Sequence, residues 1–239
     1  MTLELEHLPD DLRRILCVVA HPDDMEYGGS AAVATWVAAG AEVAYLLLTT
    51  GEAGMQAPPD VAGPLRAEEQ RRACEAVGVQ DLTILGHPDG MLVYSLDLRR
   101  DIARRIREFR PDAVYTGQFG IEAPWGLEQA DHRATGLATL DAVRDADNTW
   151  VFPELAREGL PKWHTRWLLV GGHPEPTHGI PVGPDAVAAA VRSLECHGGY
   201  LADLPNHPAP ADFIPGLLAA GGARLGTDAA ALFRAYHLG

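Results

Sequence analysis

The sequence predicts an α/β fold: a mostly parallel, doubly wound, Rossmann-like sheet with helices on both faces. Short apolar runs rich in Val, Ile and Leu alternate with longer stretches of helical periodicity, which is typical of repeated strand–helix–strand units. These runs lack polar alternation, as expected for strands covered on both faces. The chain has 239 residues, of which 47% are hydrophobic. We therefore expect one domain spanning residues 1–239.

The elements follow one another in a regular order. A strand is expected over 13–20, where RRILCVVA contains a continuous apolar run with β-branched residues. A helix over 30–40 follows and is closed by Gly40. The next strand is predicted over 42–50. The same alternation then predicts helices over 63–79, 95–110, 131–146, 184–197 and 228–238, and strands over 82–85, 112–116 and 165–172.

Three long segments at 51–63, 117–130 and 173–183 separate these elements and are rich in Gly, Pro and acidic residues. Long loops in a compact domain are often functional. Ligands of doubly wound sheets bind beyond the carboxyl ends of the strands. We therefore expect these loops to form the walls of a site.

The composition argues against several classes of function. The formal charge of −14 argues against a nucleic-acid partner, because phosphate binding requires a basic face. No apolar stretch approaches the roughly 18 residues of a membrane span, and the polar N-terminus does not resemble a signal peptide. A cytoplasmic location with reduced cysteines is expected. The single lysine, Lys162, and the absence of G-x-S-x-G disfavour Schiff-base and serine-hydrolase chemistry.

The residues AHPDD at 20–24 carry the strongest chemical signal, directly after the first predicted strand. Two adjacent carboxylates, Asp23 and Asp24, are costly near a core unless something pairs with them. His21 and Asp24 are suitable ligands for zinc or a similar first-row ion. His132 follows a later strand and is the best third ligand. Asp23 is then free to take a proton from water that such an ion acidifies.

Two alternatives to this interpretation stay open at this point. A lone His-Pro-Asp can be a reverse turn, and GHPDG at 86–90 is most simply explained in that way. Two histidines and one carboxylate also suit a ferrous oxygenase. The free carboxylate of Asp23 and the α/β layout disfavour the oxygenase.

The chain resembles the PIG-L/LmbE-like deacetylases, which remove the acetyl group from N-acetylglucosamine-type substrates. AHPDDMEYGG at 20–29 resembles the opening signature of that family, and DHRATG at 131–136 resembles its second metal motif. Supporting matches are TTGEAG at 49–54, RAEEQRRACEAVGV at 66–79, GHPDGML at 86–92 and IREFRPDAVYT at 106–116. The resemblance covers most of the chain.

The resemblance implies a zinc-dependent N-deacetylase, with Fe²⁺, Mn²⁺ and Co²⁺ as other candidate ions. His21, Asp24 and His132 match the metal ligands, and Asp23 matches the catalytic base. The implied substrate is a small N-acetylated sugar or glycosylated metabolite, which would give acetate and a free amine. Homo-oligomer formation is also implied.

Further site residues come from the same resemblance. Arg66 and Asp89 match positions that contact sugar hydroxyls, although Arg66 could instead pair with Glu69 across a helix turn. The family usually shows H-x-D-H at 129–132; here Gln129 replaces the first histidine, and Asp131 keeps the carboxylate. We expect Gln129 and Asp131 among the catalytic residues. A glutamine amide can donate a hydrogen bond to an oxyanion, but it cannot transfer a proton.

The missing histidine leaves two alternatives open. Either Asp23 handles both proton transfers, or His164, His178 or His197 enters the site. Two rival functions also remain. One is an amidase that acts on a larger sugar-amine amide of the thiol-conjugate type, and the other is a sugar-binding homologue without catalytic activity.

Overall fold

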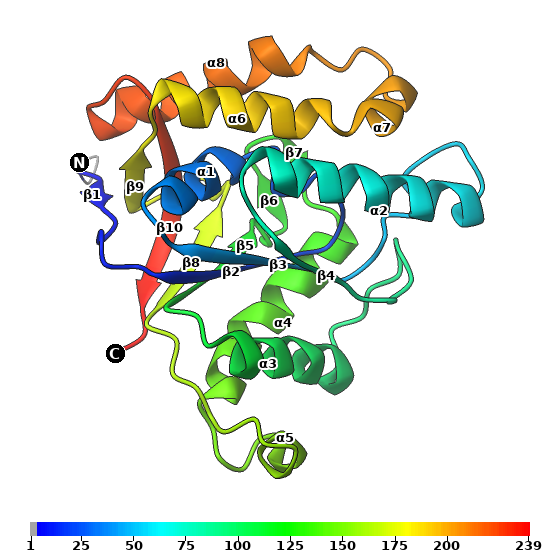
Figure 1. Cartoon of the computed structure of the whole chain (residues 1–239), viewed down its shortest axis with the longest axis vertical. Helices are drawn as coiled ribbons and strands as arrows, with labels where there is room; N and C mark the ends of the chain where they lie inside the picture. Colours follow the sequence, from blue (N-terminus) through cyan, green and yellow to red (C-terminus); the bar gives the residue numbers. More distant parts are fainter. Residues whose placement is uncertain (1–3) are drawn as a thin grey trace.

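A computed structural model describes residues 4–239 and contains an eight-stranded sheet in the order β1-β9-β10-β8-β5-β2-β3-β4. Helices cover both faces of this sheet (Figure 1). The predicted α/β class with a mostly parallel sheet is therefore confirmed. The strands are β1 (Glu6–His7), β2 (Arg14–Val19), β3 (Glu42–Leu47), β4 (Asp81–Ile84), β5 (Ala113–Gly117), β8 (Trp167–Gly171), β9 (His178–Pro181) and β10 (Ala230–His237).

The order of the strands creates a crevice beside β2. From β2 the chain adds the neighbouring strands β3 and β4 on one side, and then returns to place β5 on the other side of β2. The strand order therefore reverses between β2 and β5. Doubly wound sheets bind their ligands beyond the carboxyl ends of the strands at such a switch point.

The helices form two layers. On one face lie α1 (Ser30–Ala38), α2 (Pro59–Ala76), α6 (Pro184–Glu195) and α8 (Pro210–Leu225); on the other lie α3 (Leu96–Phe109), α4 (Ala130–Ala146) and the short α5 (Pro153–Arg157) (Figure 1). Alternate residues of β2 point into different cores. Ile15, Cys17 and Val19 pack under the first layer, whereas Leu16 and Val18 pack under the second. This explains why β2 is apolar from Ile15 onward.

The predicted start of α3 is confirmed, whereas that of α2 is four residues too late. Ser95 caps α3, because its hydroxyl oxygen accepts a hydrogen bond of 3.2 Å from the backbone N–H of Leu98. Helix α2 begins at Pro59 rather than at residue 63. Proline is favoured in the first turn, where its missing N–H has no intrahelical partner to lose.

The C-terminal prediction was wrong. Residues 228–238 were expected to form a helix, but β10 occupies Ala230–His237 and runs antiparallel to β8 and β9. Ala and Leu are good helix formers, but intrinsic propensity is a small term, and here the hydrogen bonds to two neighbouring strands outweigh it. Helix α8 was not predicted. Its Gly221 lies against β10, since a Cβ there would be 2.2 Å from the carbonyl oxygen of Ala230.

Among the helices of residues 4–239, none has both the length and the apolar character needed to cross a bilayer.

Candidate metal centre

The sheet brings the predicted metal ligands together at the switch point. His21 and Asp24 follow the end of β2. The chain leaves β5, forms a hairpin of β6 (Glu122–Ala123) and β7 (Gly126–Leu127), and enters α4, which carries His132 in its first turn. His21 and His132 are 111 residues apart in the sequence, yet their ring nitrogens are 3.2 Å apart.

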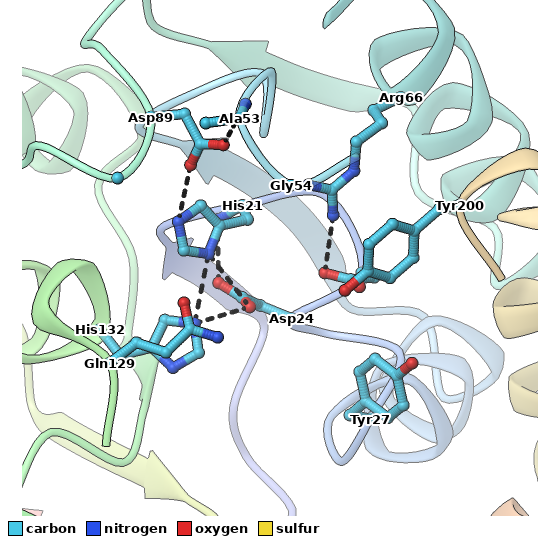
Figure 2. Close-up of a pocket in the computed structure, with 12 residues that line it drawn as sticks. His21, Asp24, Tyr27, Ala53, Gly54, Arg66, Asp89, Gln129, His132 and Tyr200 are labelled. Atoms are coloured by element: carbon cyan, nitrogen blue, oxygen red, sulfur yellow. Dashed lines mark hydrogen bonds and ion pairs between the residues drawn. The ribbon is translucent and has the colours of Figure 1, made fainter. Parts of the chain in front are cut away.

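Three ligand atoms face one another in this crevice. Nδ1 of His21 lies 3.2 Å from Nε2 of His132, which lies 3.1 Å from Oδ1 of Asp24, and the third separation is 3.7 Å. A tetrahedral ion with bonds of about 2.0–2.1 Å separates its ligand atoms by roughly 3.3 Å. Figure 2 shows the three side chains converging. Their spacing therefore fits an ion of zinc's size.

Each imidazole gives one nitrogen to this crevice and the other to a carboxylate behind it. Nδ1 of His132 lies 2.7 Å from Glu128. Nε2 of His21 lies 3.0 Å from Asp89 and 3.3 Å from Asp131. Carboxylates in this position fix the orientation of a metal-binding histidine and raise its basicity.

The charges of the site favour a cation. Burial opposes a charge on His21, but the carboxylates around it, Asp24 foremost, outweigh burial and raise its pKa to about 12. Burial likewise opposes a charge on His132, yet Asp24 and Glu128 raise its pKa to about 10. Oδ2 of Asp24 accepts hydrogen bonds from two backbone N–H groups, those of residues 20 and 21, which leaves Oδ1 to face the crevice. The donor set therefore fits a divalent ion.

A second group, His21 with Asp89 and Asp131, also has its ligand atoms close together. Its carboxylates already accept backbone hydrogen bonds: Asp131 from Gly90 and Leu92 at 2.8 and 3.1 Å, and Asp89 from residue 53 at 2.7 Å. All three residues are buried. This group is therefore better explained as the support of His21 than as a second ion site.

Asp23 lies beside the three ligands and lines the same cavity. Its Oδ1 is 3.2 Å from Nη2 of Arg66, and its backbone N–H donates to Oε1 of Gln70 at 3.0 Å. Burial raises the pKa of Asp23 to about 6, against the opposing charge of Arg66. The carboxyl group is therefore poised to exchange a proton.

Arg66 lines the cavity, and backbone oxygens hold its guanidinium group. Nη1 donates to the carbonyl oxygen of Gly51 at 2.8 Å, and Nη2 donates to that of Pro22 at 2.6 Å. It does not pair with Glu69, whose carboxylate accepts from the N–H of Gly199 at 2.6 Å. Only 2% of Arg66 is exposed. Most of its donors are used within the protein, and it fixes the walls of the cavity.

The cavity has a volume of about 250 Å³. Figure 2 shows residues that line it. Two of the three predicted loops contribute to its walls, through residues 53–54 and through Gln129. The loop at 173–183 contributes none of the lining residues, so this part of the expectation was wrong. Helix α7 (Gly198–Asp203) supplies Tyr200 instead. The complete lining is His21, Asp23, Asp24, Tyr27, Ala53, Gly54, Arg66, Asp89, Gly90, Gln129, His132 and Tyr200.

The remaining predicted residues occupy varied positions. Gln129 is exposed at the mouth of the cavity, where α4 begins. Asp131 lies behind His21 and is not part of the cavity wall. Among the suggested replacement histidines, His164 contacts Asp147 on the surface, and His178 lies in β9.

His197, the third suggested replacement, is fully buried behind the site, with Nε2 3.6 Å from Glu26. Within residues 4–239, the histidines that line the cavity are His21 and His132. In that part of the chain the structure therefore places no third histidine in the cavity wall.

Several residues of the site were not found from the sequence. Glu128 had a usable signal, because it precedes His132 by four residues and can therefore share its side of the helix start. Tyr27 and Tyr200 had no such signal in the sequence. Tyr200 lies under the guanidinium of Arg66, with the ring centroid 4.1 Å from Cζ. Burial and the nearby carboxylate of Asp23 raise the pKa of Tyr200, so its hydroxyl group stays protonated.

The fold and the site together define a doubly wound α/β protein with a candidate metal centre at the switch point of its sheet. Comparison with protein families gives the more specific assignment. The family model "PIG-L: GlcNAc-PI de-N-acetylase" matches residues 16–143, and the chain belongs to this family. The match includes the whole predicted ligand set, from His21 to His132.

Relatives of known description are deacetylases. The diacetylchitobiose deacetylase of Thermococcus kodakarensis is 30% identical over 171 residues, covering 69% of this chain and 57% of that protein. The 1D-myo-inositol 2-acetamido-2-deoxy-alpha-D-glucopyranoside deacetylase of Kineococcus radiotolerans is 44% identical over 180 residues, covering 59% and 50%. The chain thus matches about half the length of these relatives.

Solved structures share the fold. The N,N'-diacetylchitobiose deacetylase of Pyrococcus horikoshii superimposes with a TM-score of 0.83 at 20% identity, covering 95% of this chain and 85% of that one. The 4-carboxy-2-hydroxymuconate hydratase GalB of Pseudomonas putida KT2440 superimposes with a TM-score of 0.74 at 15% identity, covering 93% and 95%. Because a deacetylase and a hydratase both have this fold, the fold alone does not determine the reaction.

Proposed function

We propose that this protein is a zinc-dependent N-deacetylase that hydrolyses the acetamide of an N-acetylated amino sugar or glycoside. The observation that carries the proposal is the convergence of His21, Asp24 and His132 beside Asp23 in one cavity. The described relatives act on sugars that carry acetamido groups. A cytoplasmic location and homo-oligomer formation stay predictions from the sequence.

His21, Asp24 and His132 would hold the ion through two nitrogens and one carboxylate oxygen. Two imidazoles and a carboxylate suit zinc, with Fe²⁺, Mn²⁺ or Co²⁺ as alternatives. When bound, such an ion lowers the pKa of water and polarises a carbonyl group.

Asp23 carries the proton transfers in this proposal. Its carboxylate takes a proton from the water oxygen that attacks the acetamide carbon. As the C–N bond breaks, the same carboxyl group gives that proton to the leaving nitrogen, and acetate and a free amine result. Arg66 holds one oxygen of this carboxylate at 3.2 Å. Within residues 4–239, His21 and His132 are the histidines that line the cavity, and both are proposed metal ligands. Asp23 therefore carries out both proton transfers.

The cavity restricts the group that enters. Ligand pockets usually have about 300–1,000 Å³, whereas this cavity has about 250 Å³. It suits one acetamido sugar better than a bulky acyl group, which favours the deacetylase over the amidase alternative. Asp89 and Tyr27 line the wall and are proposed to contact the sugar.

A substrate screen tests the proposed function. Metal-reconstituted protein is incubated with N-acetylglucosamine, diacetylchitobiose and amino-sugar amides with larger acyl groups, and acetate and primary amine are both measured. Equal amounts of acetate and amine from the acetylated sugars support the proposal. Cleavage of only the larger amides would establish the amidase instead. Sugar binding without any product would establish the binding protein.

Replacing Glu128 with Gln is expected to weaken metal binding by roughly 10–100-fold. The change removes the negative charge that lies 2.7 Å from Nδ1 of His132. Chelator competition measures the affinity. Glu122→Gln, an exposed change in the neighbouring hairpin, is the matched control. Equal affinities in both variants would show that Glu128 does not support the ligand.

Replacing Gln129 with His is expected to raise kcat by about tenfold, because an imidazole can pass a proton to the leaving group and the amide cannot. Gln129→Ala is the control and is expected to lower kcat roughly tenfold, since an oxyanion donor is lost. Steady-state kinetics on the best acetylated sugar measure both. An unchanged kcat in Gln129→His would mean that the second proton transfer does not limit the reaction.

A further inference from the structure

The backbone of Asp23 has an unusual conformation. Its φ is +87°, in the left-handed region that residues other than glycine seldom occupy. Such conformations are kept only where the surroundings hold them. Here the N–H of Asp23 donates to Oε1 of Gln70, a residue of α2 that lies 47 positions along the chain. This hydrogen bond fixes the peptide that carries the proposed base.

The side-chain amide of Gln70 is itself oriented from behind. Its Nε2 donates to Oε1 of Glu26 at 3.3 Å. A carboxylate can only accept hydrogen bonds, so Glu26 selects the NH₂ end of the amide and turns the oxygen toward Asp23. Glu26 thereby sets the direction of both hydrogen bonds.

Glu26 is a buried carboxylate that does not line the cavity. It is only 1% exposed. Its Oε1 accepts from the hydroxyl group of Ser193 at 3.0 Å, and its Oε2 lies 3.6 Å from Nε2 of His197. Burial opposes a charge on His197, but Glu26 and Asp23 outweigh it and raise its pKa. A buried charge of this kind is costly unless it is paired. These partners of Glu26 are Ser193, which lies in α6, and His197, which lies just before α7.

We propose that Gln70 is a positioning residue for Asp23, and that Glu26 orients the amide of Gln70 for this purpose. The pair holds the left-handed backbone so that the carboxylate of Asp23 faces the cavity. This inference rests on the proposed role of Asp23 as the base. The rival explanation is that Glu26 only ties α1, α2 and α6 together, in which case its loss would affect stability and not turnover.

Exchanging the two side chains separates these explanations. Gln70→Glu places two carboxylates against each other, and kcat is expected to fall roughly tenfold with KM within about twofold. Glu26→Gln leaves the amide of Gln70 free to turn either way, so a smaller loss is expected. In the double variant Q70E/E26Q, the carboxylate at position 70 accepts from the N–H of Asp23. The amide at position 26 donates to that carboxylate. Its kcat is expected to recover to at least the level of Glu26→Gln.

A second measurement does not depend on activity. The amide hydrogen of Asp23 is expected to exchange slowly in the native protein and in the double variant, and at least tenfold faster in Gln70→Met, which fills the volume without an acceptor. Gln80→Met, on the surface, is the matched control. Thermal unfolding and metal content are measured on all variants, and metal content should not change.

The proposal is overturned if Gln70→Met keeps native exchange at Asp23, or if the loss of kcat in Gln70→Glu persists in the double variant. If Gln70→Glu does not fold, Gln70→Met and the double variant decide the matter. If the native protein releases no acetate from any substrate, the proposed function fails, and the exchange experiment still tests the contact between Gln70 and Asp23.

Discussion

Replacing Asp23 with Asn is expected to lower kcat by about a thousandfold while the protein keeps its metal. The change removes the group that accepts and returns the proton, and such general acid–base groups contribute about 10²–10⁴-fold. Asn has nearly the same shape and tolerates the left-handed backbone found at this position, φ +87°. The peptide should therefore keep its hydrogen bond to Gln70.

Turnover and metal stoichiometry are measured together on the Asp23→Asn protein. Asp228→Asn, an exposed change near the C-terminus, is the matched control and should retain full activity. A kcat within tenfold of the native value would remove Asp23 from the role of base. Loss of the ion together with turnover would show that Asp23 also holds the metal.

Replacing His132 with Ala is expected to abolish metal retention and to reduce activity at least a thousandfold. The change removes one of the three ligand atoms, whose separations of 3.1 and 3.2 Å from the other two fit a tetrahedral ion. With two ligands left, affinity should fall below what survives dialysis. The ion also stabilises the folded state by mass action, so the rise in Tm on adding zinc should disappear.

Metal analysis after dialysis and a Tm titration with zinc test this result. His87→Ala is the matched control, because His87 contacts Asp101 and lies outside the cavity. It should bind one ion like the native protein. If His132→Ala still retained a full equivalent of metal, the ion would have to sit elsewhere, with the group of His21, Asp89 and Asp131 as the next place to look.

The strands were predictable because their signal is local. The run from Ile15 to Val19 is apolar on both faces, as expected for a strand inside a covered sheet. The same reasoning failed for Ala230–His237, which is equally compatible with a helix by composition. Its state depends on hydrogen bonds to β8 and β9, and these strands are distant in the sequence.

The proximity of His21 and His132 could be inferred before the structure was known. Both follow strands of a parallel sheet, and the carboxyl ends of such strands meet at one edge. The distance of 3.2 Å between their ring nitrogens agrees with that inference. The role of both histidines as metal ligands stays a prediction.

The sequence by itself determined the family, the central strands and the edge of the sheet where the chemistry-bearing residues gather, because short motifs and apolar runs carry that information locally. Only the tertiary structure decided what surrounds Asp23. Gln70 and Glu26 meet behind it, and Tyr200 lines the cavity from the short helix α7. Such contacts depend on how whole helices pack against one another, and no periodicity along the chain records which side chains will meet.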